Sequence, residues 1–196
     1  ANVDVVGFLD SPLWIDQQPF PGSDFEGLGK ACQKVFSYAN VTRLGPDCVS
    51  AHGADDRWKC IMGEYRMPHV RTPYLLVASQ FDSYQLSHNV GHKPASAQEF
   101  AYAQQFATRT RNLVASLRGS WPAQAAQQNA VVSWACYSHA TSLNPSGYDQ
   151  QSCGLNGTTL DAAVQQFLAL KPASGDGPRP LEWIDNCTGF PSGAGC

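Results

Sequence analysis

The amino-acid sequence predicts an α/β fold in which a mostly parallel sheet is flanked by helices. The first observation is order: segments with strand character alternate with segments of helical periodicity, as in layered α/β folds. The second is pattern: the predicted strands are continuous apolar runs, which are typical of parallel strands covered on both faces. With 43% apolar residues among 196, the chain can also build a packed core.

The N-terminal part predicts one strand, one helix and an irregular segment. Residues 3–7 form a short apolar run that indicates a buried strand, and Pro12 is expected to stop it. Apolar residues at helical spacing predict a helix within residues 22–38. Residues 43–70 are predicted to be irregular, because Gly, Pro and Asp recur there in turn-forming pairs.

The middle of the chain predicts a strand over residues 74–78 and a long helix over residues 95–118. The strand is again a continuous apolar run. The helix carries one apolar stripe at helical spacing. Ser96 and Glu99 form a capping box at its start, and Gly119 is expected to stop it.

The C-terminal part predicts one more strand and one more helix. Residues 129–135 form the strand candidate, and the helix is expected to start at residues 158–161. Lys171 and Pro172 are expected to end that helix. The tail from residue 173 is rich in Pro and Gly and carries two late cysteines, and no further element is predicted in it.

Composition argues against two classes of partner. The formal net charge is −3 and no basic run occurs, so nucleic acid and an anionic membrane surface are poor candidates. No window approaches the ~20 consecutive apolar residues that a membrane helix needs, so no membrane span is expected. The chain begins at Ala1 rather than Met, which favours a processed or incompletely described N-terminus.

Cysteines and glycosylation sequons favour a secreted or cell-surface protein with disulfides. The seven cysteines are dispersed, with no C-x-x-C pair and no zinc-ligand spacing. Three sequons begin at Asn40, Asn156 and Asn186, and lysines are few. Because the count is odd, one cysteine cannot pair within the chain. It is either a free thiol, exposed or buried, or it forms a disulfide with a partner outside these residues.

Two ionisable side chains follow predicted strands, Asp82 after residues 74–78 and His139 after residues 129–135. Functional residues of such sheets lie at the carboxyl ends of strands. An aspartate followed by a histidine matches the second half of the α/β-hydrolase triad, whose chain order is Ser, Asp or Glu, His. By pattern alone, a turn or helix cap for Asp82 and a packed side chain for His139 are the more common roles.

No serine of this chain fits the nucleophile of such a triad. The G-x-S-x-G motif is absent, and Ser-Gly occurs only at 146–147, 174–175 and 192–193, in Pro- and Gly-rich loops with no strand before them. A nucleophile elbow needs a strand-to-helix turn. The triad serine is therefore expected outside this chain.

Five collinear segments resemble the Notum and pectin acetylesterase family. They are Phe8–Asp16, Trp58–Gly63, Gln80–Leu86, Ala135–His139 and Ile184–Cys187. Each motif alone is modestly specific, but their order and spacing together are quite specific and span nearly the whole chain. The resemblance implies an extracellular α/β-hydrolase that cleaves carboxyl esters, with the family's aspartate at Asp82 and its histidine at His139.

The same resemblance implies that residues 1–196 are the C-terminal portion of a single domain. The family's serine lies in an elbow just upstream of the strand that matches residues 3–7, so the nucleophile-bearing N-terminal portion is not in this chain. A companion N-terminal chain or segment, possibly disulfide-linked, is therefore expected. The first strand should then begin in mid-sheet, with an apolar face left for that companion.

Substrate expectations also come from the resemblance. Members of the family remove O-acetyl groups from pectin or a lipid acyl group from a secreted protein, so an ester on a polysaccharide or glycoprotein is expected. Notum has two aromatic residues where this chain has Ile61 and Met62, which favours a small acyl group. Trp14 and Tyr84 could stack on a sugar ring, and core or rim packing is the alternative for both.

No cofactor or metal is expected. His88 and His92 are four residues apart and could bind a metal if helical, but Gly91 and Pro94 predict a loop and a solvated pair. A second hypothesis from another class stays open, in which the fold serves as a non-catalytic extracellular structural or adhesive module. Asp82 and His139 would then be remnants.

Overall fold

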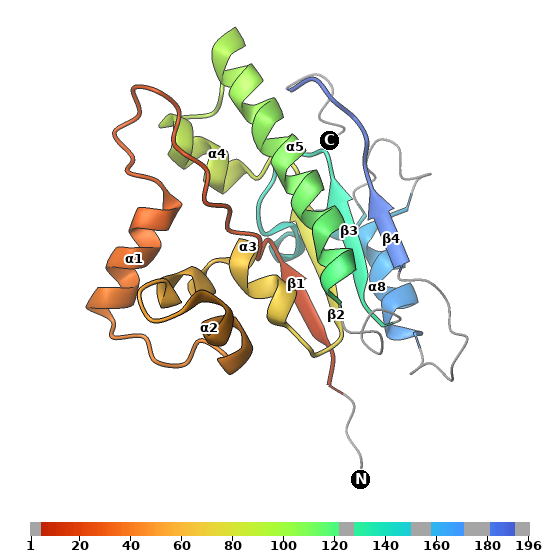
Figure 1. Ribbon diagram of the computed structural model, residues 1–196. Coiled ribbons are helices and arrows are strands. Elements are labelled where there is room, and N and C mark those ends of the chain that lie inside the picture. The colour runs from red at the N-terminus through yellow and green to blue at the C-terminus, as the bar shows by residue number, and fades with distance from the viewer. Residues whose placement is uncertain (1–4, 122–127, 150–157, 171–180, 191–196) are drawn as a thin grey trace.

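A four-stranded parallel sheet forms the centre of the molecule (Figure 1). The computed structural model describes residues 5–121, 128–149, 158–170 and 181–190. The strands lie in the order β1-β2-β3-β4 and are β1 Gly7–Asp10, β2 Tyr74–Ser79, β3 Ala130–Trp134 and β4 Leu181–Ile184. The predicted α/β fold, a parallel sheet flanked by helices, is confirmed.

Helices of very different length connect the strands. In chain order they are α1 Leu28–Tyr38, α2 Pro46–His52, η1 Arg57–Ile61, α3 Gly63–Arg66, η2 Met67–His69, α4 Ser83–Val90, α5 Ala97–Ser120, η3 Thr141–Leu143, α7 Pro145–Tyr148 and α8 Leu160–Leu168. The elements written η are 3-10 helices.

Helices cover both faces of the central strands, which explains why these strands are apolar throughout. α5 crosses one face, where Leu76 of β2 packs with Val114 (Figure 1). α8 lies on the other face, where the neighbouring residue Leu75 packs with Phe167. Because successive side chains of a strand point to opposite faces, every residue of β2 is buried.

The first strand begins later than predicted, at Gly7 rather than at residue 3. Its partner sets this start: Gly7 pairs with Tyr74, the first residue of β2, and the Gly7 N–H donates to the Pro73 carbonyl at 2.8 Å. In this register, Val5 and Val6 lie beyond the first residue of β2. They therefore have no partner in that strand and stay exposed. Residues 3 and 4 of the predicted strand lie outside the described residues.

The two longer predicted helices are present with shifted ends. α5 begins at the expected capping box, in which Ser96 Oγ accepts from the Glu99 N–H and a Glu99 carboxylate oxygen accepts from the Ser96 N–H. It runs one residue past Gly119. The helix predicted within residues 22–38 starts only at α1, because Gly27 before it has a φ of 97°, outside helical geometry.

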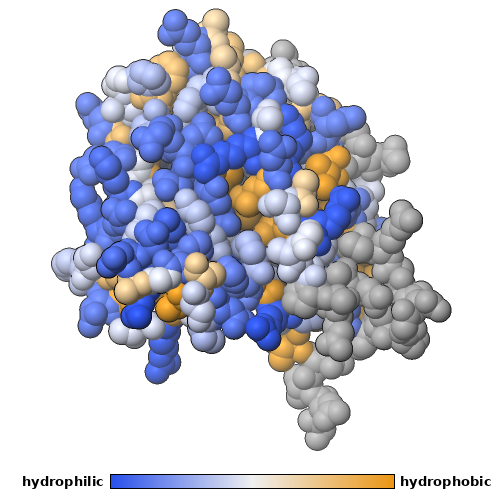
Figure 2. Space-filling view, in the orientation of Figure 1, coloured by the Kyte–Doolittle hydropathy of each residue, from blue (hydrophilic) through white to orange (hydrophobic). Residues whose placement is uncertain are grey.

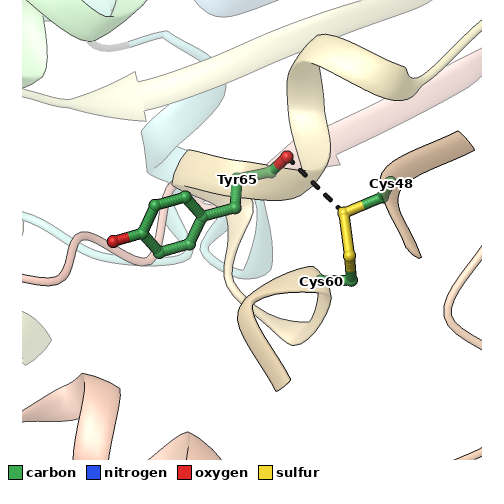
Figure 3. The surroundings of a disulfide bond; sticks show 3 residues. All are labelled: Cys48, Cys60 and Tyr65. Atoms are coloured by element: carbon green, nitrogen blue, oxygen red, sulfur yellow. Dashed lines mark hydrogen bonds between the residues drawn. A yellow bond between two sulfur atoms is a disulfide. The ribbon is translucent and has the colours of Figure 1, made fainter. Parts of the chain in front are cut away.

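The prediction of an irregular segment over residues 43–70 is wrong. Residues 46–69, here called the stapled region, form α2, η1, α3 and η2, which lie beside β1 (Figure 1). A disulfide joins Cys48 of α2 to Cys60 of η1, and Cys48 Sγ lies 3.7 Å from the Tyr65 carbonyl oxygen (Figure 3). Helices of three to seven residues carry too little periodicity to be recognised, and the crosslink supports them instead. The expected presence of a disulfide is confirmed.

Two further differences concern the C-terminal part. β4 lies in the tail where no element was predicted, because its four residues are only half-buried and form no long apolar run. It pairs with β3, and the Asp185 N–H extends the ladder to the Ser133 carbonyl at 2.8 Å. The last predicted helix is α8, which ends at Leu168, before Lys171.

The surface is mainly hydrophilic on the face shown in Figure 2, with separate hydrophobic patches. Large apolar side chains that remain exposed include Val5, Val6 and Phe8 at the start of the sheet and Leu168 at the end of α8. Within the described residues, no helix combines the length and the apolar character needed to cross a bilayer.

Candidate active site

Asp82 and His139 meet at the carboxyl edge of the sheet. His139 Nδ1 lies 2.8 Å from Asp82 Oδ2. Asp82 follows β2 and its side chain is 4% exposed, whereas His139, in the loop after β3, keeps 23% of its side chain exposed. Because a carboxylate only accepts hydrogen bonds, His139 Nδ1 donates, and in the neutral ring Nε2 is left as an acceptor.

The Asp82 carboxylate has two partners, one for each oxygen. Oδ1 accepts from the Gln85 N–H at 2.9 Å and so caps the first turn of α4, while Oδ2 accepts from His139. The helix-cap interpretation and the histidine-partner interpretation of Asp82 are therefore both correct as descriptions of its contacts. The cap fixes the carboxylate in the orientation that faces His139.

The electrostatics of the pair favour protonated His139. The hydrogen bond to Asp82 raises the pKa of His139 above its ordinary value, and burial acts in the opposite direction. The charges of Asp82 and Asp10 raise the pKa of His139 further. An imidazolium that formed during a reaction would thus be stabilised by two carboxylates.

Buried hydrogen bonds tie the loop after β2 to the loop after β3. The Gln80 N–H donates to the Trp134 carbonyl at 2.8 Å, and the Ser83 N–H donates to the Ser138 carbonyl at 3.1 Å. The Ser79 hydroxyl donates to the Cys136 carbonyl. Since Cys136 is itself in a disulfide, the loop that carries His139 is held by covalent and polar contacts.

Two aromatic side chains lie against His139. The ring centroids of Trp14 and Tyr84 are 5.7 Å and 5.2 Å from that of His139, and they lie 5.3 Å from each other in an edge-to-face pair. Tyr84 also stacks on His88 at 4.0 Å. Tyr84 is exposed and Trp14 half-buried, so both predicted substrate-binding aromatics border the histidine.

Gln85 and Gly63 place Trp14 beside the histidine. The Gln85 amide accepts from the Ile15 N–H at 2.8 Å and donates to the Leu13 carbonyl at 2.9 Å, on both sides of Trp14. A Cβ on Gly63 would lie 1.8 Å from the Pro12 carbonyl oxygen, so only glycine lets α3 approach this segment. Sequence reasoning missed both roles, although Gln85 stands within a segment that carries the family resemblance.

Ile61 and Met62 pack into two apolar clusters of the stapled region. Met62 is fully buried in an apolar cluster with Leu28 and Trp58, against which Trp14 packs. Ile61 packs against the cluster that contains the disulfide. Their part in acyl-group selection stays a prediction.

The predicted glycosylation sites have the exposure that modification requires where they are described. Asn40 and Asn186 are exposed, and Asn40 has a φ of 46° in the left-handed region. Asn156 lies outside the described residues. Glycosylation at the three positions stays a prediction.

Among the described residues, the other cysteines and histidines form no metal-binding group with Asp82 and His139. Cys187, like Cys136, is in a disulfide, and Cys32 on α1 is a half-buried free thiol whose pKa is raised by burial. The donor atoms of Cys48, His52 and His69 lie within 4.8 Å of one another, but a disulfide sulfur is no thiolate ligand.

The predicted loop around His88 and His92 is wrong in part. His88 belongs to α4, which ends at Val90, so its backbone is helical. His92 follows the helix and pairs with Glu99 at 3.3 Å. The two imidazoles therefore have separate partners, Tyr84 for His88 and Glu99 for His92.

Comparisons with known proteins agree with this architecture. A family model described as pectinacetylesterase matches residues 1–196. Among solved structures, the Wnt deacylase Notum from Drosophila is similar, with a TM-score of 0.71 and 19% sequence identity. That match covers 94% of this chain and 48% of the Notum chain, so this chain spans about half the length of that protein. A search of curated proteins gives no match.

Proposed function

The chain belongs to the pectinacetylesterase family, and from this premise we propose that it is the C-terminal portion of a secreted serine carboxylesterase. The substrate is an O-acetyl ester on a cell-wall or extracellular polysaccharide. One observation carries the proposal: Asp82 holds His139 Nδ1 at the carboxyl edge of a parallel sheet, which directs Nε2 toward a partner.

His139 acts in this mechanism first as general base and then as general acid. Nε2 takes the proton of a serine hydroxyl as the serine oxygen attacks the ester carbonyl, and Asp82 stabilises the resulting imidazolium. Collapse of the tetrahedral intermediate breaks the ester bond, and His139 gives the proton to the departing sugar oxygen, which leaves as a hydroxyl. Water then repeats the sequence on the acetyl-enzyme and releases acetate. No described serine hydroxyl is hydrogen-bonded to His139, and the proposed nucleophile comes from outside this chain.

The open edge of β1 is where the nucleophile-bearing portion docks in this proposal. Among the described strands, β1 pairs only with β2. Phe8 points to the α8 face of the sheet and remains 40% exposed, next to the exposed Val5 and Val6. Apolar residues at a bare strand edge favour a covering partner. A parallel strand added there would end at the same edge as Asp82 and His139.

Three further features of the structure support a companion chain, a sugar substrate and secretion. Cys32 is the free thiol of the described residues and is available for a disulfide to a companion chain. Trp14 and Tyr84 offer ring faces on which a sugar could stack beside His139. The disulfides and the exposed sequon residues Asn40 and Asn186 support secretion.

The second candidate is a non-catalytic extracellular module on the same fold. The observation in its favour is the absence of a G-x-S-x-G motif from the chain. Intact mass without reductant separates the two. A mass near 21.2 kDa plus glycans means that the chain stands alone and lacks a triad. A mass roughly doubled that falls on reduction supports a linked companion.

The decisive experiment is fluorophosphonate labelling of the protein as purified, followed by mapping of the labelled peptide. We expect the label on a serine of a companion segment, with acetate released from an acetylated polysaccharide. Phenylmethylsulfonyl fluoride should block both signals. Esterase activity without any labelled serine, or no activity in material that contains the companion, would overturn the proposal.

A further inference from the structure

Asp10 and Ser11 connect the end of β1 to the loop that carries His139. Ser11 Oγ donates to Asp10 Oδ1 at 2.9 Å and accepts from the Ala140 N–H at 2.9 Å. Asp10 Oδ2 accepts from the Ser142 N–H at 2.7 Å. Asp10, the last residue of β1, and the adjacent Ser11 thus hold the two backbone N–H groups that flank Thr141, some 130 positions further along the chain.

The backbone on both sides of this bridge is unusual. Ser11 has a φ of 55° and Ala140 a φ of 50°, and neither is glycine. Such residues are strained and persist only where the surroundings impose them. Ser11 is buried and anchored to β2 through its N–H, which donates to the Val77 carbonyl at 2.8 Å. The two strained residues, Ser11 and Ala140, are therefore hydrogen-bonded to each other and, through Ser11, to β2.

Asp10 also supplies a cap that the loop cannot supply for itself. The helix η3 follows directly after Ala140, which has no side-chain oxygen to accept the first N–H groups. The Asp10 carboxylate accepts the Ser142 N–H in its place, from another strand. The N–H of Ala140, the neighbour of His139, is held by Ser11 Oγ, so the two contacts together fix the backbone directly after His139.

We propose that Asp10 and Ser11 are positioning residues for His139. Asp82 orients the imidazole ring through Nδ1, and the Asp10–Ser11 pair orients the backbone that carries it, so His139 is held from two strands at once. This inference rests on the proposed esterase function. The ionisable groups that act on His139 are Asp82 and Asp10, and the Tyr84 ring packs against it.

The test compares Ser11→Gly and Asp10→Asn in the assembled esterase. Glycine accommodates the left-handed backbone of residue 11 and removes the hydroxymethyl side chain with its two hydrogen bonds. We expect kcat to fall by about tenfold to 10²-fold with KM nearly unchanged, because small misplacements of a catalytic group have effects of this size. Ser116→Ala, which removes an exposed hydroxyl on α5, and Asp161→Asn on α8 are the matched controls and should leave kcat unchanged.

Asp10→Asn has a second readout that a purely structural role would not change. The base form of His139 is neutral, so activity rises as pH passes upward through its pKa. Removal of the Asp10 charge lowers that pKa, and the acidic limb of the pH profile should move to lower pH. Ser11→Gly keeps the charge and should move the limb less. Titration of the His139 ring by NMR, assigned with His139→Gln, measures the same pKa without requiring activity.

Three outcomes separate the claims. Full kcat and an unmoved pH limb in both variants, with Asp82→Asn inactive, would overturn the positioning role and leave the esterase intact. Full activity of Asp82→Asn would overturn the proposed function itself. If a variant loses thermal stability, the rate of fluorophosphonate labelling below its melting temperature still reports the orientation of His139, and an unchanged rate contradicts the inference.

Discussion

The carboxyl-end region, meaning residues 10–11, 79–85 and 134–142, differs from the stapled region in what holds it together. In the carboxyl-end region, polar groups that follow three strands pair with one another, as Asp82 does with His139 and Ser11 with the Ala140 N–H. The stapled region is held by the Cys48–Cys60 disulfide and by apolar clusters around Trp58 and Leu44.

This difference separates geometry from stability. Directional hydrogen bonds fix the orientation of a side chain, but each contributes only about 1 kcal/mol net. A disulfide contributes more to stability and fixes little about a ring some distance away. Changes at the residues that orient His139 should therefore act mainly on turnover, and loss of the crosslink of the stapled region mainly on the free energy of unfolding.

The largest expected effect is on turnover and comes from Asp82→Asn. An asparagine still caps α4, because Asn and Asp are comparable N-cap residues, so stability should change little. Its amide can favour the wrong imidazole tautomer, and kcat should fall by about 10⁴-fold. Turnover of an aryl acetate by the assembled esterase, with the melting temperature in parallel, measures both. A fall in kcat of less than tenfold would mean that the hydrogen bond between Asp82 and His139 does not control turnover.

The next effect is on stability and comes from Cys48→Ala combined with Cys60→Ala. Loss of a crosslink that closes a loop of this size should lower the free energy of unfolding by about 3 kcal/mol. For a chain of this length, the melting temperature should fall by roughly 6–12 °C. Urea titration gives the free energy, and kcat at 25 °C should stay within a few-fold of the parent. A loss of turnover comparable to that of Asp82→Asn would show that the two regions are not separable.

The smallest effects distinguish two arginines of α5, each of which reaches one region. Arg111 donates to Oε1 of the fully buried Gln80 at 2.8 Å, while Arg109 pairs with Glu64 of the stapled region at 2.6 Å and is 40% exposed. Arg111→Ala leaves a buried oxygen unpaired and should cost about 1–3 kcal/mol. Arg109→Ala removes a partly solvated ion pair and should cost less than about 1 kcal/mol. Urea titrations of both variants test this order, and equal costs would contradict it.

Much of the sheet and its long covering helix could be predicted from local pattern. β2 and β3 are continuous apolar runs because helices cover both of their faces, and the run itself carries that information. α5 carries its start signal in Ser96 and Glu99. β4 and the stapled region could not be predicted in this way. β4 is stabilised by pairing with β3, and the stapled region by the Cys48–Cys60 disulfide. Neither contact produces a periodic pattern of apolar residues in the local sequence.

The candidate site divides in the same manner. Asp82 and His139 could be proposed from their places after strands, and Trp14 and Tyr84 from the segments that carry the family resemblance. The positioning roles of Gln85, Asp10 and Ser11 could not, although these residues lie in the same segments, because their partners are separated from them by 70 to 132 positions in the chain. A glutamine or serine has the same appearance in a sequence whether its hydrogen bonds are to water or to a catalytic loop.

The sequence by itself determined the alternation of β1, β2 and β3 with α1, α5 and α8, the two ionisable residues at strand ends and the absence of a nucleophile motif from these residues. These properties depend on residue type and short-range spacing. Only the tertiary structure decided which cysteines pair, where β1 begins, and that β1 supplies the contacts behind His139. Parallel pairing brings the ends of β1, β2 and β3 to one edge, and the register of that pairing is a property of the packed sheet rather than of any one strand.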